Sequence, residues 1–104
     1  MRAFPIFLSL AGARAIVCGG TPAATRKIDL LLAASARVEL IADELCEELY
    51  RMVLERRIVW RGDTLNTVAL DGAAIVIAAD TRERRNADAS AMARARGLPV
   101  NVVD

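Results

Sequence analysis

The sequence predicts an α/β fold in which a doubly wound, parallel, five-stranded sheet carries helices on both faces. Two observations support this prediction. Short apolar runs rich in valine and isoleucine alternate with stretches whose apolar residues recur at helical spacing, which is typical of parallel strands joined by helices. The run at 73–79 is apolar throughout, as expected for a strand that is covered on both faces.

The predicted elements follow one another as strand, helix, strand, helix, strand, strand, helix, strand. Strands are expected at 13–18, 37–42, 57–60, 73–79 and 100–103, and helices at 23–34, from 43 to about 53, and at 81–96. Residues 5–10 are expected to form an extended lead-in, and 63–70 one helical turn and a loop. Pro22 suits a first helical turn, where its missing N–H is not needed, and Gly97 suits the position just past a helix end.

Length and charge narrow the classes of function. The 104 residues form one domain, and a hydrophobic content of 55% is enough for a heavily buried centre. The net charge of +1 gives no basic excess of the kind that binds nucleic acid. The sequence does contain a local group of arginines, which alternates with acidic residues and alanines and is therefore interpreted as a solvated helix face. Its members are Arg82, Arg84, Arg85, Arg94 and Arg96.

The cysteines and the lack of histidine exclude several kinds of site. The two cysteines, Cys18 and Cys46, are far apart and not in metal-ligand spacing, so no bound metal is expected. Cys18 is expected to be a small buried hydrophobe. Since the sequence contains no histidine, acid–base chemistry must use Asp, Glu, Lys, Tyr or a bound cofactor. No secretory signal or membrane-length apolar run is found, and a reducing cytoplasm is the expected compartment.

The turn after the first predicted strand resembles a dinucleotide-binding fingerprint. It reads Gly19-Gly20-Thr21-Pro22-Ala23-Ala24, which keeps the first glycine and the alanine of G-x-G-x-x-A but replaces the second glycine by threonine. In a Rossmann-like domain this turn places backbone N–H groups and a helix N-terminus next to a pyrophosphate. A turn that only reverses the chain is the alternative. The strand before it and the helix after it favour nucleotide binding.

Two acidic residues follow the second predicted strand. Asp43 and Glu44 lie near the position where a ribose-binding carboxylate is expected, and they would repel a 2′-phosphate, which favours NAD over NADP. The alternative is that they are acids in the first turn of a helix, where they complement its dipole without binding a ligand.

Several motifs together resemble the N-terminal domain of siroheme synthase, the precorrin-2 dehydrogenase/sirohydrochlorin ferrochelatase family. The similarity runs from end to end, and its specificity comes from the order and spacing of the motifs. The matching segments are FPIFL at 4–8, VCGG at 17–20, ATRK at 24–27, ARV at 36–38, VIAAD at 76–80, Asn86, and PVNVVD at 99–104.

The resemblance implies a Rossmann-like NAD(P)-binding domain that binds NAD and oxidises precorrin-2 to sirohydrochlorin. It implies that Asp104 removes a proton in this oxidation and serves as a base when ferrous iron, a substrate, is inserted. The phosphates would lie along Gly19, Gly20, Thr21, Pro22 and Ala23. Asp43 and Glu44 would lie by the adenosine, and Ala78, Ala79 and Asp80 by the ribose and nicotinamide end.

The sequence departs from the family at three places. Thr21 replaces a glycine and puts a β-branched side chain where the pyrophosphate is expected to approach. Pro22 and Ala23 replace the usual x-Val pair, which removes one backbone donor. Ser35 stands where glycine is common, which is tolerable if its φ angle is negative.

Family members are longer than this chain. They continue into a dimerisation and helical domain, and many into a uroporphyrinogen-III methyltransferase, so residues 1–104 are expected to be a fragment with weak activity or none. The full-length protein is expected to be a homodimer.

Other functions remain open at this stage. One is a nucleotide-sensing Rossmann module without chemistry, and another is a domain kept for folding or dimer contacts. Asp104 would then be a solvated terminal residue. A class I methyltransferase is disfavoured because the turn runs directly into Arg26-Lys27.

Overall fold

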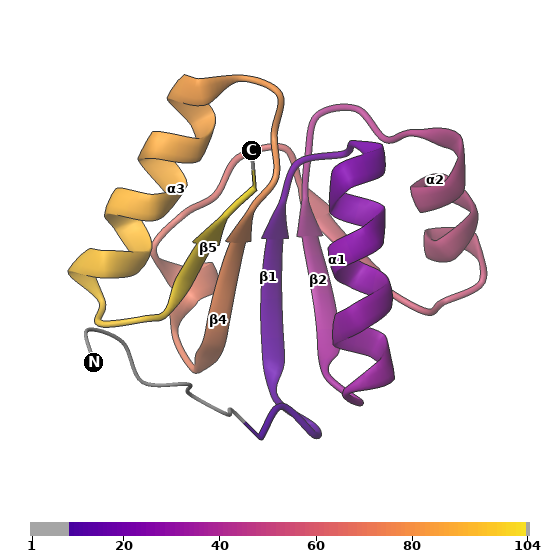
Figure 1. Ribbon diagram of the computed structural model, residues 1–104, viewed down its shortest axis with the longest axis horizontal. Helices are drawn as coiled ribbons and strands as arrows, with labels where there is room; N and C mark the ends of the chain where they lie inside the picture. The colour runs from indigo at the N-terminus through magenta and orange to yellow at the C-terminus, as the bar shows by residue number, and fades with distance from the viewer. Residues whose placement is uncertain (1–8, 104) are drawn as a thin grey trace, which may run out of the picture.

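The computed structural model describes residues 9–103, which form a five-stranded parallel sheet in the order β3-β2-β1-β4-β5 (Figure 1). The strands are β1 (Arg14–Cys18), β2 (Arg37–Ile41), β3 (Val59–Gly62), β4 (Ala73–Ala78) and β5 (Val100–Val102). The helices are α1 (Pro22–Ala33), α2 (Glu47–Leu54) and α3 (Glu83–Ala95), with one short 3-10 turn, η1 (Val68–Leu70). The motif at 4–8, residues 5–8 of the expected lead-in, and Asp104 lie outside the described residues.

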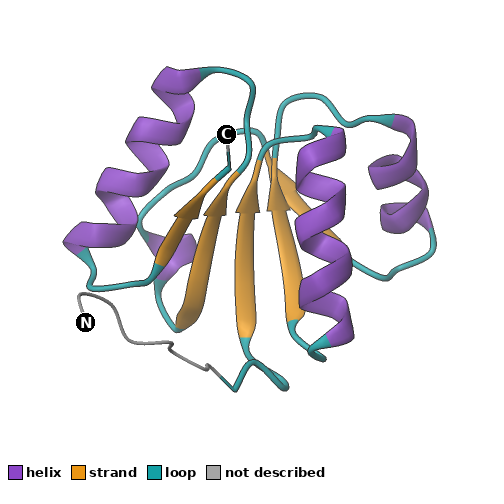
Figure 2. Cartoon of the chain, viewed as in Figure 1, coloured by secondary structure: helices purple, strands orange, loops and turns teal. Residues whose placement is uncertain are grey.

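Helices cover both faces of the sheet, which confirms the doubly wound arrangement (Figure 2). On one face α1 and α2 bury Ile28, Leu31 and Leu49 against inward-facing residues of β1 and β2. On the other face α3 packs Ala89 and Ala93 against β1 and β4, and Leu70 of η1 extends this second core. These small alanines bring α3 close to the sheet. The result is a three-layer sandwich.

The chain order reverses at β1, which lies between β2 and β4. From β1 the chain runs outwards to β2 and β3, then crosses to β4 and continues to β5. All pairings are parallel. The loops after β1, β2 and β4 therefore meet at one edge of the sheet, where open α/β sheets bind their ligands.

Two elements depart most from the sequence prediction, while the others agree with it to within one or two residues. The helix expected from Asp43 begins at Glu47, and the first-turn acids are Glu47 and Glu48. The preceding loop is held against the glycine turn, since the Cys46 N–H donates to the Gly20 carbonyl at 2.8 Å. The third strand lies two residues later than expected, at Val59–Gly62, because its position is set by pairing with β2 at the sheet edge.

Ser35 takes the backbone conformation that glycine prefers. Its φ is +63°, so the condition under which serine replaces glycine without strain, a negative φ, is not met. The Ser35 carbonyl accepts the Gly12 N–H at 2.9 Å, and this bond fixes the turn between α1 and β2. Gly97, which follows α3, has φ +69° and fulfils its predicted role at the helix end.

A buried acid joins three strands of the sheet. Glu39 of β2 accepts from Arg14 Nε of β1 at 2.7 Å and from Arg61 Nε of β3 at 3.2 Å. Arg14 also donates to the carbonyls of Ala69 and Asp71, so it fixes the segment between η1 and β4 to the sheet. The hydrogen bond from Arg14 holds the pKa of Glu39 below its usual value, against the opposing effect of burial.

We expect Ser35→Gly to raise the free energy of unfolding by about 0.5–1 kcal/mol, because glycine removes the left-handed strain of a side chain at φ +63°. The control is Ala34→Gly, whose φ is −87°; it should lower stability, because glycine gains freedom in the unfolded chain. Urea denaturation of both variants checks this. A loss of stability in Ser35→Gly would contradict it.

We expect Glu39→Gln to lower the free energy of unfolding by about 2 kcal/mol at pH 7, because it leaves two arginines without their charged partner. The pKa of Glu39 is lower in the folded protein than in the unfolded chain. Its stabilisation is therefore complete above the ordinary glutamate pKa and is lost as the pH falls towards the folded-state pKa.

Urea denaturation of wild type and Glu39→Gln between pH 7 and pH 4 should show the difference narrowing at the acid end. The exposed Glu47, which pairs with Arg51 on the surface of α2, supplies the control. Glu47→Gln should change stability by less than about 0.5 kcal/mol at any pH. A difference for Glu39→Gln that grew on acidification would refute the assigned direction.

Candidate functional site

The glycine turn between β1 and α1 is pressed between two other loops. A Cβ on Gly19, whose φ is +124°, would lie 2.4 Å from the Ala79 carbonyl oxygen after β4. A Cβ on Gly20 would lie 1.7 Å from the Glu44 carbonyl oxygen after β2. The predicted reason for these glycines is that they let a phosphate approach the backbone. The structure supplies a nearer cause, which is that neighbouring backbone occupies the space of a side chain.

Thr21 caps helix α1 with its side chain. Its hydroxyl donates to the Ala79 carbonyl at 2.8 Å and accepts from the Ala24 N–H at 3.1 Å. Both bonds lie within the protein, so the hydroxyl ties the glycine turn to the loop after β4. This side chain, which was predicted to lie where a pyrophosphate would approach, thus has a capping role as well.

The backbone around this cap keeps three donors free. Pro22 is the first residue of α1, as predicted, and has no N–H. Gly19 N–H donates to Ile41 O at 2.9 Å. Within residues 9–103, the N–H groups of Gly20, Thr21 and Ala23 have no hydrogen-bond acceptor. These three donors at a helix N-terminus form a ready site for an anion.

Asn86 of α3 fixes the loop after β4. Its amide oxygen accepts the Asp80 N–H at 2.9 Å, and its amide nitrogen donates to the Asp80 carbonyl at 2.8 Å. The side chain is buried and both hydrogen-bonding groups are satisfied. Sequence reasoning noted Asn86 only as part of the family resemblance, because nothing local shows that its partner is the Asp80 peptide.

Charged side chains from two loops meet above the turn. Arg82 donates to both oxygens of Asp43, at 2.7 and 2.9 Å, and to both oxygens of Asp80, at 2.8 and 2.9 Å. Arg85 Nε lies 3.6 Å from Asp80, and its NH1 3.7 Å from Asp43. The hydrogen bonds from Arg82 hold the pKa values of Asp43 and Asp80 below their usual range, and those carboxylates raise the pKa of Arg82.

This cluster corrects the interpretation of the arginines as a solvated helix face. Arg84 does fit that interpretation, since it is 89% exposed and 3.7 Å from Asp88 one turn further on. Arg82 and Arg85 instead turn towards the carboxyl edge of the sheet. Periodicity could not reveal this, because Asp43 lies 39 residues away in the sequence.

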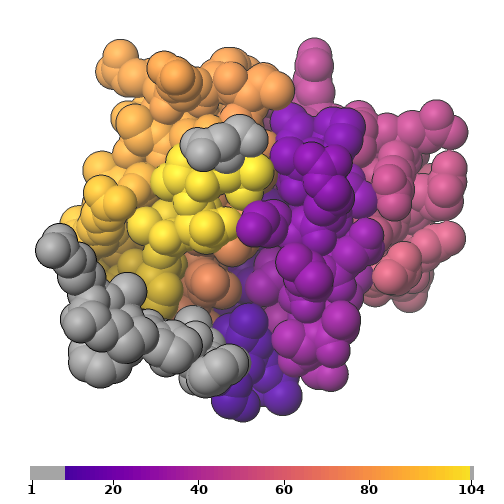
Figure 3. All heavy atoms as spheres, viewed as in Figure 1, coloured from indigo at the N-terminus to yellow at the C-terminus, as the bar shows by residue number. Residues whose placement is uncertain are grey.

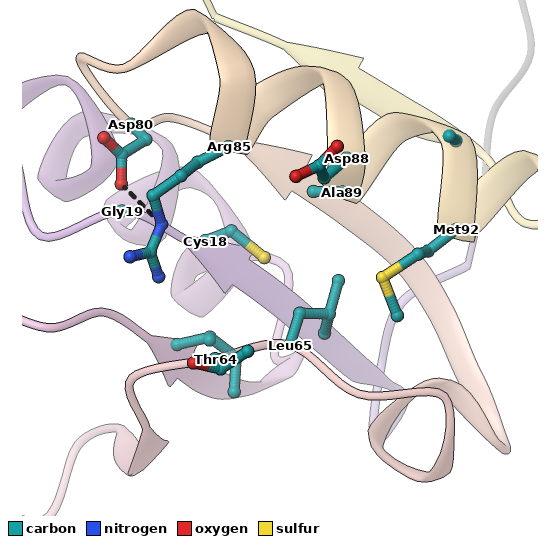
Figure 4. A pocket seen from close by; sticks show the side chains of 11 residues that line it. Cys18, Gly19, Thr64, Leu65, Asp80, Arg85, Asp88, Ala89 and Met92 are labelled. Atoms are coloured by element: carbon teal, nitrogen blue, oxygen red, sulfur yellow. Dashed lines mark ion pairs between the residues drawn. The ribbon is translucent and has the colours of Figure 1, made fainter.

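Three hollows meet at Asp80, which borders each of them. The smallest, about 340 Å³, lies over the turn between Gly20, Thr21, Asp43 and Arg82. A second, about 510 Å³, lies between α3 and the segment after β3, where Leu65 and Met92 face each other and Arg85 reaches towards Asp80 (Figure 4). Cys18 also lines it; burial raises the pKa of this thiol to about 12, in agreement with an unreactive apolar role.

The third hollow, about 730 Å³, is lined by the start of α1, the end of β5 and residues of α3. Thr21, Pro22 and Ala23 border it on one side, and Val102 and Val103 on the other. Figure 3 shows the atoms of α1 and β5 next to each other on this face. The chain therefore reaches its last described residue, Val103, at the edge of this hollow.

The structure brings together nearly all the residues predicted for the site. Those at the carboxyl edge of the sheet, on the three loops, are Gly19, Gly20, Thr21, Pro22, Ala23, Asp43, Glu44, Ala79 and Asp80. Ala78 is fully buried beneath them, and its carbonyl accepts the Val103 N–H at 2.8 Å. Asp104 lies outside the described residues. Between residues 9 and 103, no cluster of three or more metal-binding side chains occurs, and no helix is long and apolar enough to cross a membrane.

Comparison with known proteins agrees with this geometry. Residues 6–104 match a protein family described as "Putative NAD(P)-binding". The chain belongs to this family of NAD(P)-binding domains. Its fold resembles that of SirC, precorrin-2 dehydrogenase, with a TM-score of 0.75 at 19% identity, over 85% of this chain and 44% of that chain.

Named relatives make the assignment more particular. Over its whole length the chain is 38% identical to the siroheme synthase of Neisseria meningitidis serogroup C (strain 053442) and 42% identical to that of Ectopseudomonas mendocina (strain ymp). It spans 22% of the length of each. The predicted resemblance to the NAD(P)-binding domain of siroheme synthase is confirmed.

We expect Thr21→Val to lower the free energy of unfolding by about 1–2 kcal/mol, because valine keeps the shape but loses the helix cap and the bond to Ala79. Thr21→Ser retains a hydroxyl able to make both bonds and is the matched control. Urea denaturation compares the two. Equal stability of the variants would show that the hydroxyl does not perform the assigned capping role.

Proposed function

We propose that this domain binds NAD across the carboxyl edge of its sheet, with the pyrophosphate on the glycine turn. The observation that supports this most is the set of three N–H groups, at Gly20, Thr21 and Ala23, that have no acceptor among the described residues and lie at the N-terminus of α1. Phosphate oxygens are the acceptors that such donors favour, and the helix dipole adds to the attraction. The Arg82 guanidinium borders the hollow over this turn, together with Asp43, Glu44 and Asp80.

The three hollows suit the parts of a dinucleotide. The one beside Ile41, Leu65 and Arg85 has apolar walls and a cation that suit an adenine ring. Asp43 and Glu44, which border the smallest hollow, over the glycine turn, suit the adenosine ribose. Their negative charge disfavours the 2′-phosphate of NADP, although Arg82 offsets part of the charge on Asp43. The hollow between Ala79 and Val103 suits the nicotinamide end.

The reaction that we propose is the oxidation of precorrin-2 to sirohydrochlorin. NAD, when bound, supplies a hydride acceptor. The chain's own contribution is to orient the ligands and to remove a proton from the macrocycle. We assign the proton removal to the Asp104 carboxylate, because the residue before it, Val103, borders the hollow assigned to the nicotinamide.

Because the chain spans 22% of the named siroheme synthases, we propose that iron insertion, with ferrous iron as a substrate, needs segments outside these 104 residues. The same holds for formation of a homodimer and for methyl transfer to uroporphyrinogen III. We propose the reducing cytoplasm as the compartment, with neither nucleic acid nor membrane as a partner.

A second candidate is a module that senses NAD without chemistry. The specific observation in its favour is the reduced donor set of the turn, in which Pro22 has no N–H and Ala24 N–H is held by Thr21. Such a module would bind NAD but would not need a carboxylate at Asp104. The two functions therefore differ in the effect of a change at this residue.

We expect Asp104→Asn to slow precorrin-2 oxidation at least about 100-fold while leaving NAD affinity unchanged. A lost general base costs this much, whereas binding depends on the turn. NAD affinity is measured by titration calorimetry, with NADP alongside, which should bind about tenfold more weakly.

The control is Asp29→Asn, an exposed aspartate on α1, which should alter neither quantity. Unchanged oxidation in Asp104→Asn would refute the catalytic role of this residue and favour the sensing module. A folded wild-type protein that bound no NAD would contradict both functions.

A further inference from the structure

The glycine turn offers fewer donors than a complete fingerprint. Pro22 has none, Gly19 N–H is held by Ile41, and Ala24 N–H by the Thr21 hydroxyl. Three N–H groups remain for a pyrophosphate, which carries two negative charges. A further positively charged group in the hollow over the glycine turn would compensate for the missing donors.

Arg82 is the arginine that borders this hollow. Its Nε donates to Asp80, its Nη1 to Asp43, and its Nη2 to both carboxylates. The two partners differ in burial, since the Asp80 side chain is 5% exposed and that of Asp43 is 38% exposed. The bond to Asp43 is therefore the more exposed to solvent and the easier to exchange.

Arg85 can take over the partner that Arg82 would release. Its Nη1 lies 3.7 Å from Asp43, and its Nε 3.6 Å from Asp80. When the Nη1 group of Arg82 leaves Asp43 for another anion, Asp43 still has the Arg85 guanidinium beside it. The exchange thus leaves no carboxylate of the cluster without a positive neighbour.

We propose that Arg82 is a pyrophosphate-binding residue of the dinucleotide site, anchored on Asp80 and exchanging Asp43 for a phosphate oxygen when the ligand binds. This inference rests on the proposed NAD-binding function. The Nη1 group of the guanidinium provides two N–H donors for the phosphate, while the hydrogen bond from Nε to Asp80 is kept. Arg82 thereby replaces the donors that Pro22 and the capped Ala24 do not supply.

The test uses inorganic pyrophosphate and NAD as separate probes in titration calorimetry at fixed ionic strength. Arg82→Ala should weaken the binding of both about tenfold. Asp43→Asn should tighten pyrophosphate about threefold, because it releases the Nη1 group of Arg82. Pyrophosphate contains no ribose, so the loss of a ribose contact at Asp43 does not enter that measurement.

The two variants break the same ion pair, yet they are expected to change pyrophosphate affinity in opposite directions. If Arg82 served only to join the two loops, both variants would weaken binding, and that result would overturn the proposal. Arg84→Ala, which changes an exposed arginine in the first turn of α3, is the matched control and should change neither affinity. Should Arg82→Ala fail to fold, as seen by circular dichroism, Arg82→Lys takes its place, with about threefold weaker binding expected.

The outcomes also separate this proposal from the one on which it rests. Wild-type affinity for NAD and pyrophosphate in a folded Arg82→Ala would overturn the role of Arg82 and leave NAD binding intact. Pyrophosphate binding that depends on Arg82, with no binding of NAD, would support Arg82 as an anion ligand and refute the dinucleotide function. A wild-type protein that bound neither probe would overturn both.

Discussion

The close approach of three loops at Gly19 and Gly20 is the constraint on which the rest of the site depends. The loop after β4 lies where a Gly19 side chain would be, and the loop after β2 where a Gly20 side chain would be. The carboxyl ends of β1, β2 and β4 are thereby held within backbone contact. N–H groups of the turn, a helix N-terminus and the carboxylates of Asp43 and Asp80 then share one edge of the sheet.

Two ion clusters perform different tasks in this arrangement. Glu39 is buried among Arg14 and Arg61 and joins strands to the crossover segment, so it contributes to the stability of the scaffold. Arg82 lies between Asp43 and Asp80 at the mouth of the site, where half of its side chain is exposed. A cluster that is open to solvent can exchange partners with a ligand at low cost, whereas a buried one cannot. Position and burial are thus consistent with a structural task for the first cluster and with the binding task proposed for the second.

The sequence predicted those features that depend on local pattern or on general topology. The apolar run that became β4, the proline at the start of α1 and Gly97 after α3 all lie where expected. Convergence of the site residues followed from the rule that parallel strands end at one edge. The start of α2, the register of β3 and the positive φ of Ser35 depend on contacts between distant segments. Arg82 was misassigned for the same reason, since its partner Asp43 belongs to another loop.

The central claim is that the three unpaired amides of the turn hold the pyrophosphate, and amide chemical shifts of the ¹⁵N-labelled chain during addition of NAD test it most directly. We predict that the amide signals of Gly20, Thr21 and Ala23 shift the most, because each gains a charged acceptor. Those of Gly12 and Gly97, in turns away from the site, should stay in place. Binding of NAD that left the three turn amides unchanged, or no binding by the folded chain, would contradict the account.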